Sequence, residues 1–306
     1  MDAPAAIWYT AITFKTNKLA EYKLSAPVIA PEGTVHTARI CGAPLPGVYS
    51  THTRSDHRFS KHWHDVYGFG LLEDGAQSWL SDRGQVRAYA GSVISTNPGE
   101  VHDGRPLGGS TRQWRIISVS LDAMAGLTDT TPGTLSISTP VIEDPLLASV
   151  LKRAFATLES FSTREQKDAT ERLACEEALI DACTILMNRH GTPRLAARVP
   201  AADVKRARER LVEDPANPPT LSELAALTGL SRYQVLRRFT KAYGLPPHAW
   251  LIAHRVEQAR TLIRAGRPLA EAGIRAGFAD QSHMTRLFMR HYGYTPGAWR
   301  RAVAPQ

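Results

Sequence analysis

Two groups of residues in this sequence combine useful chemistry with regular spacing. Three histidines form the first group: His62 and His64 stand two residues apart, and His102 follows in a later segment. Imidazole nitrogens are good ligands for Zn²⁺ and other transition metals. The second group consists of arginines, hydroxylated residues and a glutamine that recur at helical spacing in the C-terminal third. Such side chains on a helix can hydrogen-bond to base edges in the DNA major groove. The first group therefore indicates a metal or ligand site, and the second a nucleic-acid site.

The second group lies within an internal repeat. Residues 221–229 and 269–277 share a leucine, a glutamate and a final glycine, at a spacing of 48 residues. Beyond that glycine the spacing becomes 49, and the correspondence continues to Trp250 in the first copy and Trp299 in the second. Each copy predicts an apolar helix, a glycine that can adopt the left-handed conformation, a short turn and a second helix. This is the arrangement of a helix-turn-helix unit.

The second helix of each unit is expected to present one face to DNA. Ser231 can cap the first of these helices and Asp280 the second. The apolar residues predicted to face inward are Val235, Phe239, Met284 and Phe288. The predicted DNA-contacting residues are Tyr233, Leu236, Arg237 and Thr240 in the first helix and Gln281, Ser282, Thr285, Arg286 and Arg290 in the second. Because the two sets differ, one molecule should read an asymmetric site.

The distribution of charge agrees with nucleic-acid binding. The chain of 306 residues has a formal net charge of +8. Residues 201–306 hold 17 Lys or Arg against 8 Asp or Glu, whereas the rest of the chain holds 20 against 21. A basic domain attracts polyanions and releases counterions when it docks on DNA. All of the excess positive charge is therefore in the region that contains the repeat.

The N-terminal part has the pattern of a β domain. Short segments rich in β-branched and aromatic residues are separated by turns, such as those at 73–75, 82–84 and 97–99. This pattern indicates an antiparallel sandwich or barrel. The predicted organisation is an α+β protein with an N-terminal extension of uncertain structure at 1–33, a β domain at 34–142, a helical connector at 143–191, a linker at 192–200 and a helical DNA-binding domain at 201–302.

The connector is predicted to contain two amphipathic helices. The first starts at Pro145, and the second starts at Ser162 and Thr163 and is closed by Gly191. Helices of this kind either cover the core of the β domain or form a homodimer surface. The sequence leaves both alternatives open.

A distinctive set of residues lies in and around the second unit: Gly277, Phe278, Asp280, Gln281, Ser282, Arg286, Phe288, Arg290, Gly293, Thr295, Pro296 and Arg300. In these positions, and over residues 201–302 as a whole, the sequence resembles the DNA-binding domain of the AraC/XylS family of transcriptional regulators. The resemblance implies two helix-turn-helix units bridged by a long helix at about residues 247–265. It also implies that both recognition helices enter successive major-groove segments, ~34 Å apart. Met284 and Met289 depart from the family pattern at positions that affect packing and phosphate contact.

The segments around the three histidines, at 62–64 and 91–102, resemble the two motifs of the cupin fold, which sensor domains of this family share. The resemblance implies a β-barrel with an effector pocket. Metal-binding cupins add an acidic residue to the histidines, but no acid occurs within 66–72. We therefore predict no metal or other cofactor and keep a metal on the histidines as an alternative. The predicted pocket comprises His62, His64, Tyr67, Trp79 and His102, with Trp63 and Arg115 as further aromatic and cationic lining.

These features favour a regulator of transcription, not an enzyme. The predicted partners are double-stranded DNA, a small-molecule effector, RNA polymerase and, through residues 143–191, a second copy of the chain. The sequence has neither an export signal nor a long apolar run, so we expect a cytoplasmic protein that does not enter membranes.

Two alternatives remain at this point. A metal-dependent cupin enzyme would use His62, His64 and His102 as ligands, but it leaves the C-terminal repeat unexplained. A DNA-repair protein with the same DNA-binding module needs an activated cysteine. None of the three cysteines, Cys41, Cys175 and Cys183, has cysteine-rich or evidently basic neighbours in the sequence.

Overall fold

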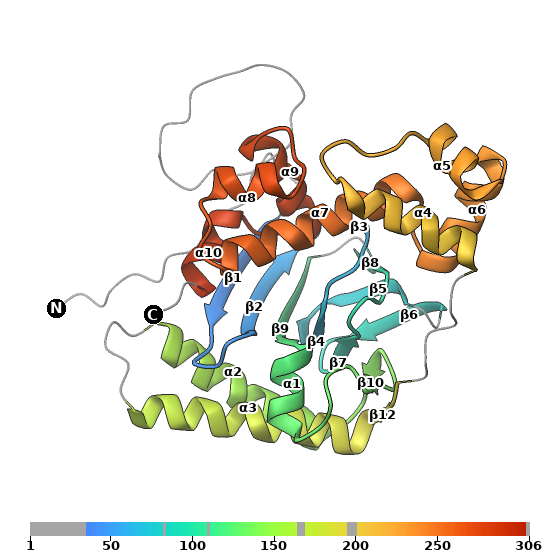
Figure 1. Cartoon of the computed structure of the whole chain (residues 1–306). Helices are drawn as coiled ribbons and strands as arrows, with labels where there is room; N and C mark the ends of the chain where they lie inside the picture. Colours follow the sequence, from blue (N-terminus) through green and yellow to red (C-terminus); the bar gives the residue numbers. More distant parts are fainter. Residues whose placement is uncertain (1–34, 82–83, 109–110, 164–168, 195–200, 304–306) are drawn as a thin grey trace.

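The computed structural model has a sheet-rich N-terminal part and a helical C-terminal part (Figure 1), which confirms the predicted α+β class. It describes residues 35–81, 84–108, 111–163, 169–194 and 201–303. The predicted extension at 1–33, the first two residues of the turn at 82–84 and residues 195–200 of the predicted linker lie outside these ranges.

The strands of the N-terminal part form antiparallel sheets around a cavity. The larger sheet has the order β1-β2-β9-β4-β7-β11, and a second sheet has the order β3-β8-β5-β6. These strands are β1 (His36–Gly42), β2 (Val48–Ser55), β3 (Phe59–His62), β4 (Val66–Asp74), β5 (Ala76–Ser81), β6 (Gly84–Tyr89), β7 (Val93–Thr96), β8 (His102–Pro106), β9 (Arg112–Ser120) and β11 (Val141–Ile142). A short third sheet pairs β10 (Leu135–Ile137) with β12 (Gly191–Pro193). The arrangement is the predicted cupin-like one.

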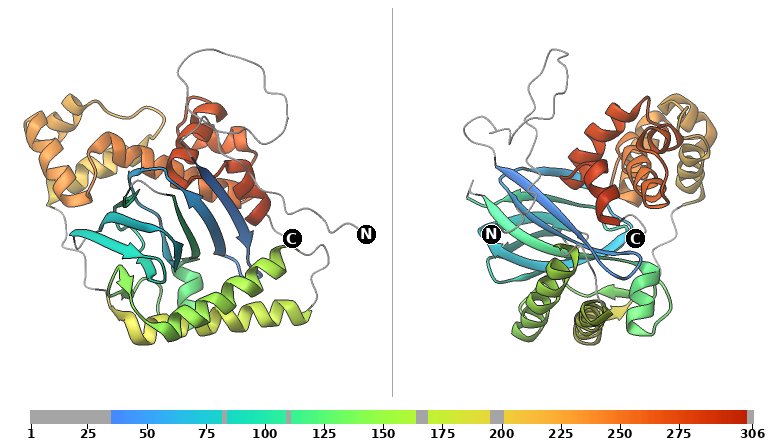
Figure 2. Two further views of the ribbon diagram at one scale, coloured as in Figure 1. Left: turned by 180° about the vertical axis from the view of Figure 1, so that it is seen from behind. Right: turned by 90° about the vertical axis from the view of Figure 1, so that its left-hand side faces the viewer.

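One face of the larger sheet is covered by helices. α1 (Leu121–Thr128), α2 (Pro145–Thr163) and α3 (Ala169–His190) share one apolar core with β4 and β9. In Figures 1 and 2 the long helices α2 and α3 run beneath the sheets, and the C-terminal helices lie above them. The other face of the larger sheet lines the cavity. Because both faces of the sheet are covered, β4 is buried along most of its length.

Two details of the helical prediction are wrong. Helix α1 was not predicted, because its eight residues follow directly on β9 and Ser120 serves as both the end of the strand and the N-cap. The predicted helix start at Ser162 and Thr163 lies inside the last turn of α2, where the Thr163 hydroxyl donates to the Glu159 carbonyl. A hydroxylated residue can bond to the preceding turn of a helix as well as cap the next helix.

The C-terminal part contains two helical clusters joined by α7. Its helices are α4 (Ala202–Glu213), α5 (Leu221–Thr228), α6 (Arg232–Tyr243), α7 (Pro247–Arg264), α8 (Leu269–Arg275), α9 (Gln281–Tyr292) and α10 (Pro296–Val303). The first cluster packs α4, α5 and α6 against the start of α7, and the second packs α8, α9 and α10 against its later turns. The predicted long bridging helix at 247–265 is therefore confirmed. None of the helices in the described ranges has both the length and the apolar character needed to cross a bilayer.

Candidate functional site

The two predicted recognition helices are α6 and α9, and both are capped as expected. The Ser231 side chain accepts a hydrogen bond from the backbone N–H of Gln234, and the Asp280 side chain accepts one from His283. The four apolar residues predicted to face inward are all buried: Val235, Phe239, Met284 and Phe288. The helical periodicity therefore identified the inner face of each helix correctly.

The opposite faces of both helices are open. Tyr233 is 70% exposed and Leu236 is 41% exposed, so two large side chains of α6 lie uncovered. The other predicted DNA-contacting residues are exposed or half-buried: Arg237, Thr240, Gln281, Ser282, Thr285, Arg286 and Arg290. This face is available to a DNA groove.

The cavity of the β domain has a volume of about 180 Å³ and lies between the two larger sheets. Its walls mix apolar and polar side chains and include residues of α9 and of the segment after it. The lining includes Phe59, His62, His64, Gln77, Trp79, His102, Arg112, Trp114, His291, Tyr292 and Tyr294.

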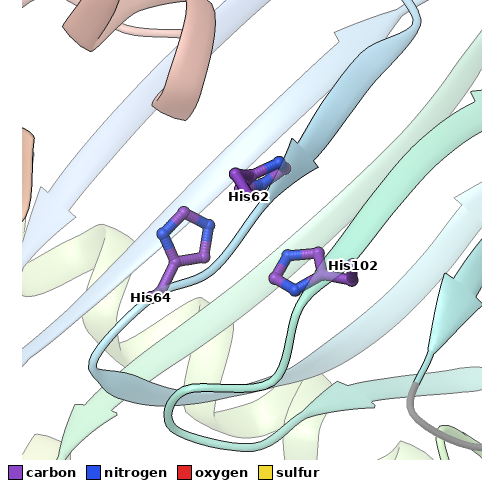
Figure 3. Close-up of side chains that lie close together, drawn as sticks. All are labelled: His62, His64 and His102. Atoms are coloured by element: carbon purple, nitrogen blue, oxygen red, sulfur yellow. The ribbon is translucent and has the colours of Figure 1, made fainter. Parts of the chain in front are cut away.

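The three histidines identified from the sequence line the cavity and lie close together (Figure 3), with donor nitrogens within 4.8 Å of one another. His62 and His102 are directly opposite each other on paired strands, with ring centroids 4.5 Å apart. His64 follows β3, and its ring centroid lies 4.8 Å from that of His62 and 5.3 Å from that of His102. Burial lowers the pKa of all three, that of His64 to about 3. The imidazoles are therefore neutral at physiological pH, which is the form that binds metals.

Tyr67, Trp63 and Arg115 do not line the cavity, in contrast to the prediction. The Tyr67 hydroxyl donates to the Leu135 carbonyl on the face of the sheet covered by helices. Trp63 points instead toward the C-terminal part, where its ring stacks near Trp250. Arg115 pairs with Glu73 and lies over the ring of Phe155, again on the helix-covered face.

Arg112 is the cationic residue of the cavity and was missed in the sequence. It lies three residues before Arg115 on β9, so the two side chains point to opposite faces. Its guanidinium donates to the Gln77 side chain and to backbone carbonyls of β2 and the following loop, and it lies 4.7 Å above the ring of Trp114. Burial lowers the pKa of Arg112 to about 10, so it stays charged at neutral pH. Strand alternation counted from a known cavity residue would have found it.

The C-terminal part closes the cavity through three residues, which the sequence analysis also missed: His291, Tyr292 and Tyr294. The His291 ring nitrogen Nε2 bonds to the Trp63 carbonyl at 3.1 Å, and the ring of Tyr292 stacks on His64 at 4.9 Å. A comparison of the two copies of the repeat could have indicated this contact. At the spacing of 49, His291 corresponds to Ala242 and Tyr294 to Leu245, so the second unit departs from the first at two of these three positions.

A buried polar network holds this second unit against the β domain. Arg260 and Glu257 of α7 form an ion pair at 3.1 Å, and both are less than a tenth exposed. Arg260 also donates to the Tyr49 hydroxyl of β2, while Glu257 accepts from Tyr292. Burial alone would raise the pKa of Glu257, but the Arg260 charge beside it lowers the pKa below its usual value. The network is therefore ionised and joins the two parts of the chain.

Two family models match the chain: the AraC-like ligand binding domain over residues 45–182, and a Helix-turn-helix domain over residues 224–302. The uncharacterized HTH-type transcriptional regulator YbfI of Bacillus subtilis (strain 168) is 30% identical over 229 residues, which are 74% of this chain and 82% of YbfI. This chain belongs to the AraC family of transcriptional regulators.

Other proteins are similar to this regulator over part of its length or in structure. The transcriptional activator NphR of Rhodococcus sp is 40% identical over 86 residues, 28% of this chain and 25% of NphR. The structure of ToxT from Vibrio cholerae aligns with 85% of this chain and 100% of that one, at 11% identity and a TM-score of 0.44.

The family assignment gives each part of the regulator a role. The C-terminal helix-turn-helix domain binds DNA, and the N-terminal domain is the effector-binding one. The matched segment of the N-terminal domain contains most of the residues that line the cavity. The three cysteines are buried and burial raises the pKa of each, that of Cys183 to about 12, which is the opposite of the activation that a DNA-repair nucleophile requires.

Proposed function

We propose that this regulator responds to a small anionic effector bound in the cavity, with Arg112 as the residue that recognises the negative charge. Arg112 is 1% exposed, and among the described residues no carboxylate lies within ion-pair distance of it, although the charge of Asp56 partly offsets the lowering of its pKa by burial. A buried charge without an opposite charge is costly, and an anionic ligand would remove that cost. This buried, unpaired cation is the observation that carries the proposal.

The rest of the cavity suits the body of a small organic anion. Trp114 and Phe59 flank the guanidinium of Arg112, and Ile94 and Ile116 add apolar surface. The volume of about 180 Å³ is below the range of ~300 to 1,000 Å³ for pockets that hold drug-sized ligands. Trp79 lines the cavity, and its indole Nε1 is buried without a hydrogen-bond partner in the described part of the chain. The effector class that fits is a small aromatic or branched carboxylate.

We further propose that the effector acts through the shared wall of the cavity. Residues of both parts line it, so a ligand in the cavity contacts the β domain and the second helix-turn-helix unit together. An effector shifts a conformational equilibrium only when it binds one state better than the other. A ligand that requires both walls binds the docked arrangement best and therefore controls how α9 is presented to DNA.

The DNA contacts are proposed to come from the outward faces of α6 and α9. Arg237 and Arg286 occupy equivalent positions of the repeat, are exposed, and belong to the residue type that most often recognises guanine. Tyr233, Leu236, Thr240, Gln281, Ser282, Thr285 and Arg290 complete the proposed interface. Contact with RNA polymerase stays a prediction of the sequence.

Binding of small carboxylates tests the role of Arg112. Titration of the full chain with benzoate and related carboxylates, followed by calorimetry, should show binding that uncharged benzamide does not show. Arg112→Gln should weaken it roughly 10- to 100-fold, because a hydrogen bond to a charged group is lost. Arg115→Gln is the matched control, since Arg115 lies on the same strand but on the opposite face. Equal affinities in wild type and Arg112→Gln would refute the proposal.

A homodimer through residues 143–191 is a second proposal. Leu173 and Ile180 are seven residues apart on α3 and are 55% and 45% exposed, which leaves an apolar strip on that helix. Sedimentation of the wild type and of Leu173→Glu with Ile180→Glu tests it. A mass that is the same for both chains would show that this strip forms no dimer.

The metal-dependent enzyme considered as an alternative is not favoured. A regulatory role explains both the repeated C-terminal unit and the closure of the cavity by residues of the DNA-binding domain. Catalysis would explain neither.

A further inference from the structure

A fourth imidazole adjoins the three histidines of the β domain, and it comes from the DNA-binding domain. The ring centroid of His291 on α9 lies 4.9 Å from that of His62 and 5.3 Å from that of His64. Imidazoles bound to one tetrahedral metal through nitrogens at ~2.0 to 2.1 Å have ring centroids roughly 5 Å apart. Five of the six ring pairs, all except His102 with His291, therefore have centroid distances of 4.5 to 5.3 Å, and His64 belongs both to the group of donor atoms with His62 and His102 and to the group with Glu257 and His291.

The hydrogen bonds of three of the rings, those of His62, His102 and His291, leave one nitrogen of each without a proton. The Nδ1 atoms of His62 and His102 lie 2.6 and 2.9 Å from backbone carbonyls, and the Nε2 atom of His291 bonds to the Trp63 carbonyl. A carbonyl only accepts, so each of these nitrogens carries the proton and the other nitrogen of the ring carries a lone pair. The Nδ1 atom of His64 lies 3.6 Å from the ionised Glu257. Metal-binding histidines are held in this way, by an acceptor on the far nitrogen.

This arrangement is unfavourable without a cation. Neutral imidazoles with lone pairs gather here, and the carbonyls and the carboxylate around them accept hydrogen bonds, so they donate none to those lone pairs. A divalent cation would turn these lone pairs into ligand bonds.

We propose that His62, His64, His102 and His291 form one transition-metal site that fastens α9 to the β domain. Zn²⁺ is the ion that fits best, because it accepts four nitrogen ligands in tetrahedral geometry. His291 takes the place of the acidic ligand that is absent from residues 66–72. Glu257 is engaged by Arg260 and Tyr292, so it orients His64 and does not bind the ion.

The site would couple metal binding to domain arrangement. Three ligands belong to the β domain and the fourth to the second recognition helix, so the ion binds the docked arrangement more tightly than any arrangement in which α9 has moved away. The proposal does not depend on the effector class, because it rests on the four histidines and not on Arg112.

Zinc binding to the full-length chain tests the proposal. Metal-free wild type, titrated with Zn²⁺ against a chromophoric chelator, should bind one tight equivalent. His291→Gln keeps an amide that can donate to the Trp63 carbonyl but loses the ligand nitrogen, and it should weaken binding by at least on the order of 100-fold, more than loss of an outer-shell partner. His248→Gln, at an exposed position on α7, should bind as the wild type does.

Two results would overturn the proposal. The first is that the wild-type chain does not bind one equivalent of Zn²⁺ tightly. The second is tight binding that His291→Gln leaves unchanged, which would place the ion on the β domain alone. Hydrogen exchange of the wild type provides a measurement that does not rely on a variant folding. Zn²⁺ should slow amide exchange in α9 as well as around β3 and β8, whereas an ion held only by the β domain would leave α9 unchanged.

Discussion

The two helix-turn-helix units have similar sequences but different surroundings. The first unit packs α5 and α6 against α4 and the start of α7, and its apolar core contains no strand residue. The second unit has Tyr49 of β2 within its core, and Ala38 and Ile40 of β1 pack against it. The apolar core of one unit is thus built on helices alone, although Trp63 stacks near Trp250 at its edge, and the core of the other is built partly on the effector domain.

The difference comes from a few positions at the ends of the recognition helices. Where α6 ends in Ala242 and Tyr243, α9 ends in His291 and Tyr292, and both of the latter reach the cavity. The folds of the units are maintained by the residues they share, such as Phe239 and Phe288, which are both fully buried. Between the ends of α6 and α9, His291 in place of Ala242 is therefore the change that gives the second copy a further side chain in the cavity.

The largest expected effect comes from breaking the ion pair under the second unit. Arg260→Ala leaves Glu257 buried without its partner, and such a loss costs ~3 to 5 kcal/mol. Arg238→Ala, which removes a half-exposed ion pair with Asp203 in the first unit, should cost ~0 to 1 kcal/mol. Urea unfolding of the full chain measures both. Equal losses would mean that the network between the two parts contributes no more than a surface pair.

A smaller effect is expected from the two equivalent arginines that face DNA. Arg237→Ala and Arg286→Ala should each lose ~1 to 3 kcal/mol of binding to a specific site and relax discrimination at one base position. Fluorescence anisotropy with specific and random duplexes at a fixed salt concentration measures the change. If only Arg237→Ala weakened binding, the second unit, which contains Arg286, would not enter the groove. Equal losses on specific and random DNA would reduce both residues to phosphate contacts.

The smallest effect is expected at the helix caps, where the units again differ. Thr220 and Glu223 form a reciprocal capping box at the start of α5, whereas α8 begins after Pro268 without a side-chain cap. Thr220→Ala should cost ~0.5 to 2 kcal/mol of stability. Pro268→Ala serves as the comparison, because no capping hydrogen bond is lost there. Thermal unfolding, followed by circular dichroism, measures both variants. Equal losses of stability in Thr220→Ala and Pro268→Ala would contradict the prediction.

The helices of the C-terminal part were predictable because each has one buried and one open face. Val235 and Met284 are buried beside exposed neighbours, so the helical period is visible in the residue types. Each recognition helix also has its own local start signal in Ser231 or Asp280. Local signals of this kind do not depend on the rest of the fold.

The lining of the cavity was only partly predictable, because β4 and β9 are covered on both faces. His62, His64, Trp79 and His102 line it as expected, but Tyr67 does not. In β4 every residue from Val66 to Leu72 is buried, so apolar type does not distinguish the face that packs on helices from the face that lines the cavity. An error of one residue moves a side chain to the other face, as the contrast between Arg112 and Arg115 shows.

The contact between the two parts could not be derived from local pattern. His36 of β1 bonds to the Gly293 carbonyl at 2.7 Å, across 257 positions of sequence. Neither residue belongs to a motif that suggests the other. Such long-range pairs depend on how the finished parts fit together, which the periodicity of a single segment does not describe.

The one-sided docking of the helical part has a consequence for the promoters that this regulator controls. The half of an operator read by α6 would contribute the same affinity with and without the effector, because no described residue of the first unit lines the cavity. The half read by α9 would contribute an affinity that changes when the effector binds. Base changes in the two halves should therefore have separable phenotypes, one altering the level of expression under all conditions and the other altering its inducibility.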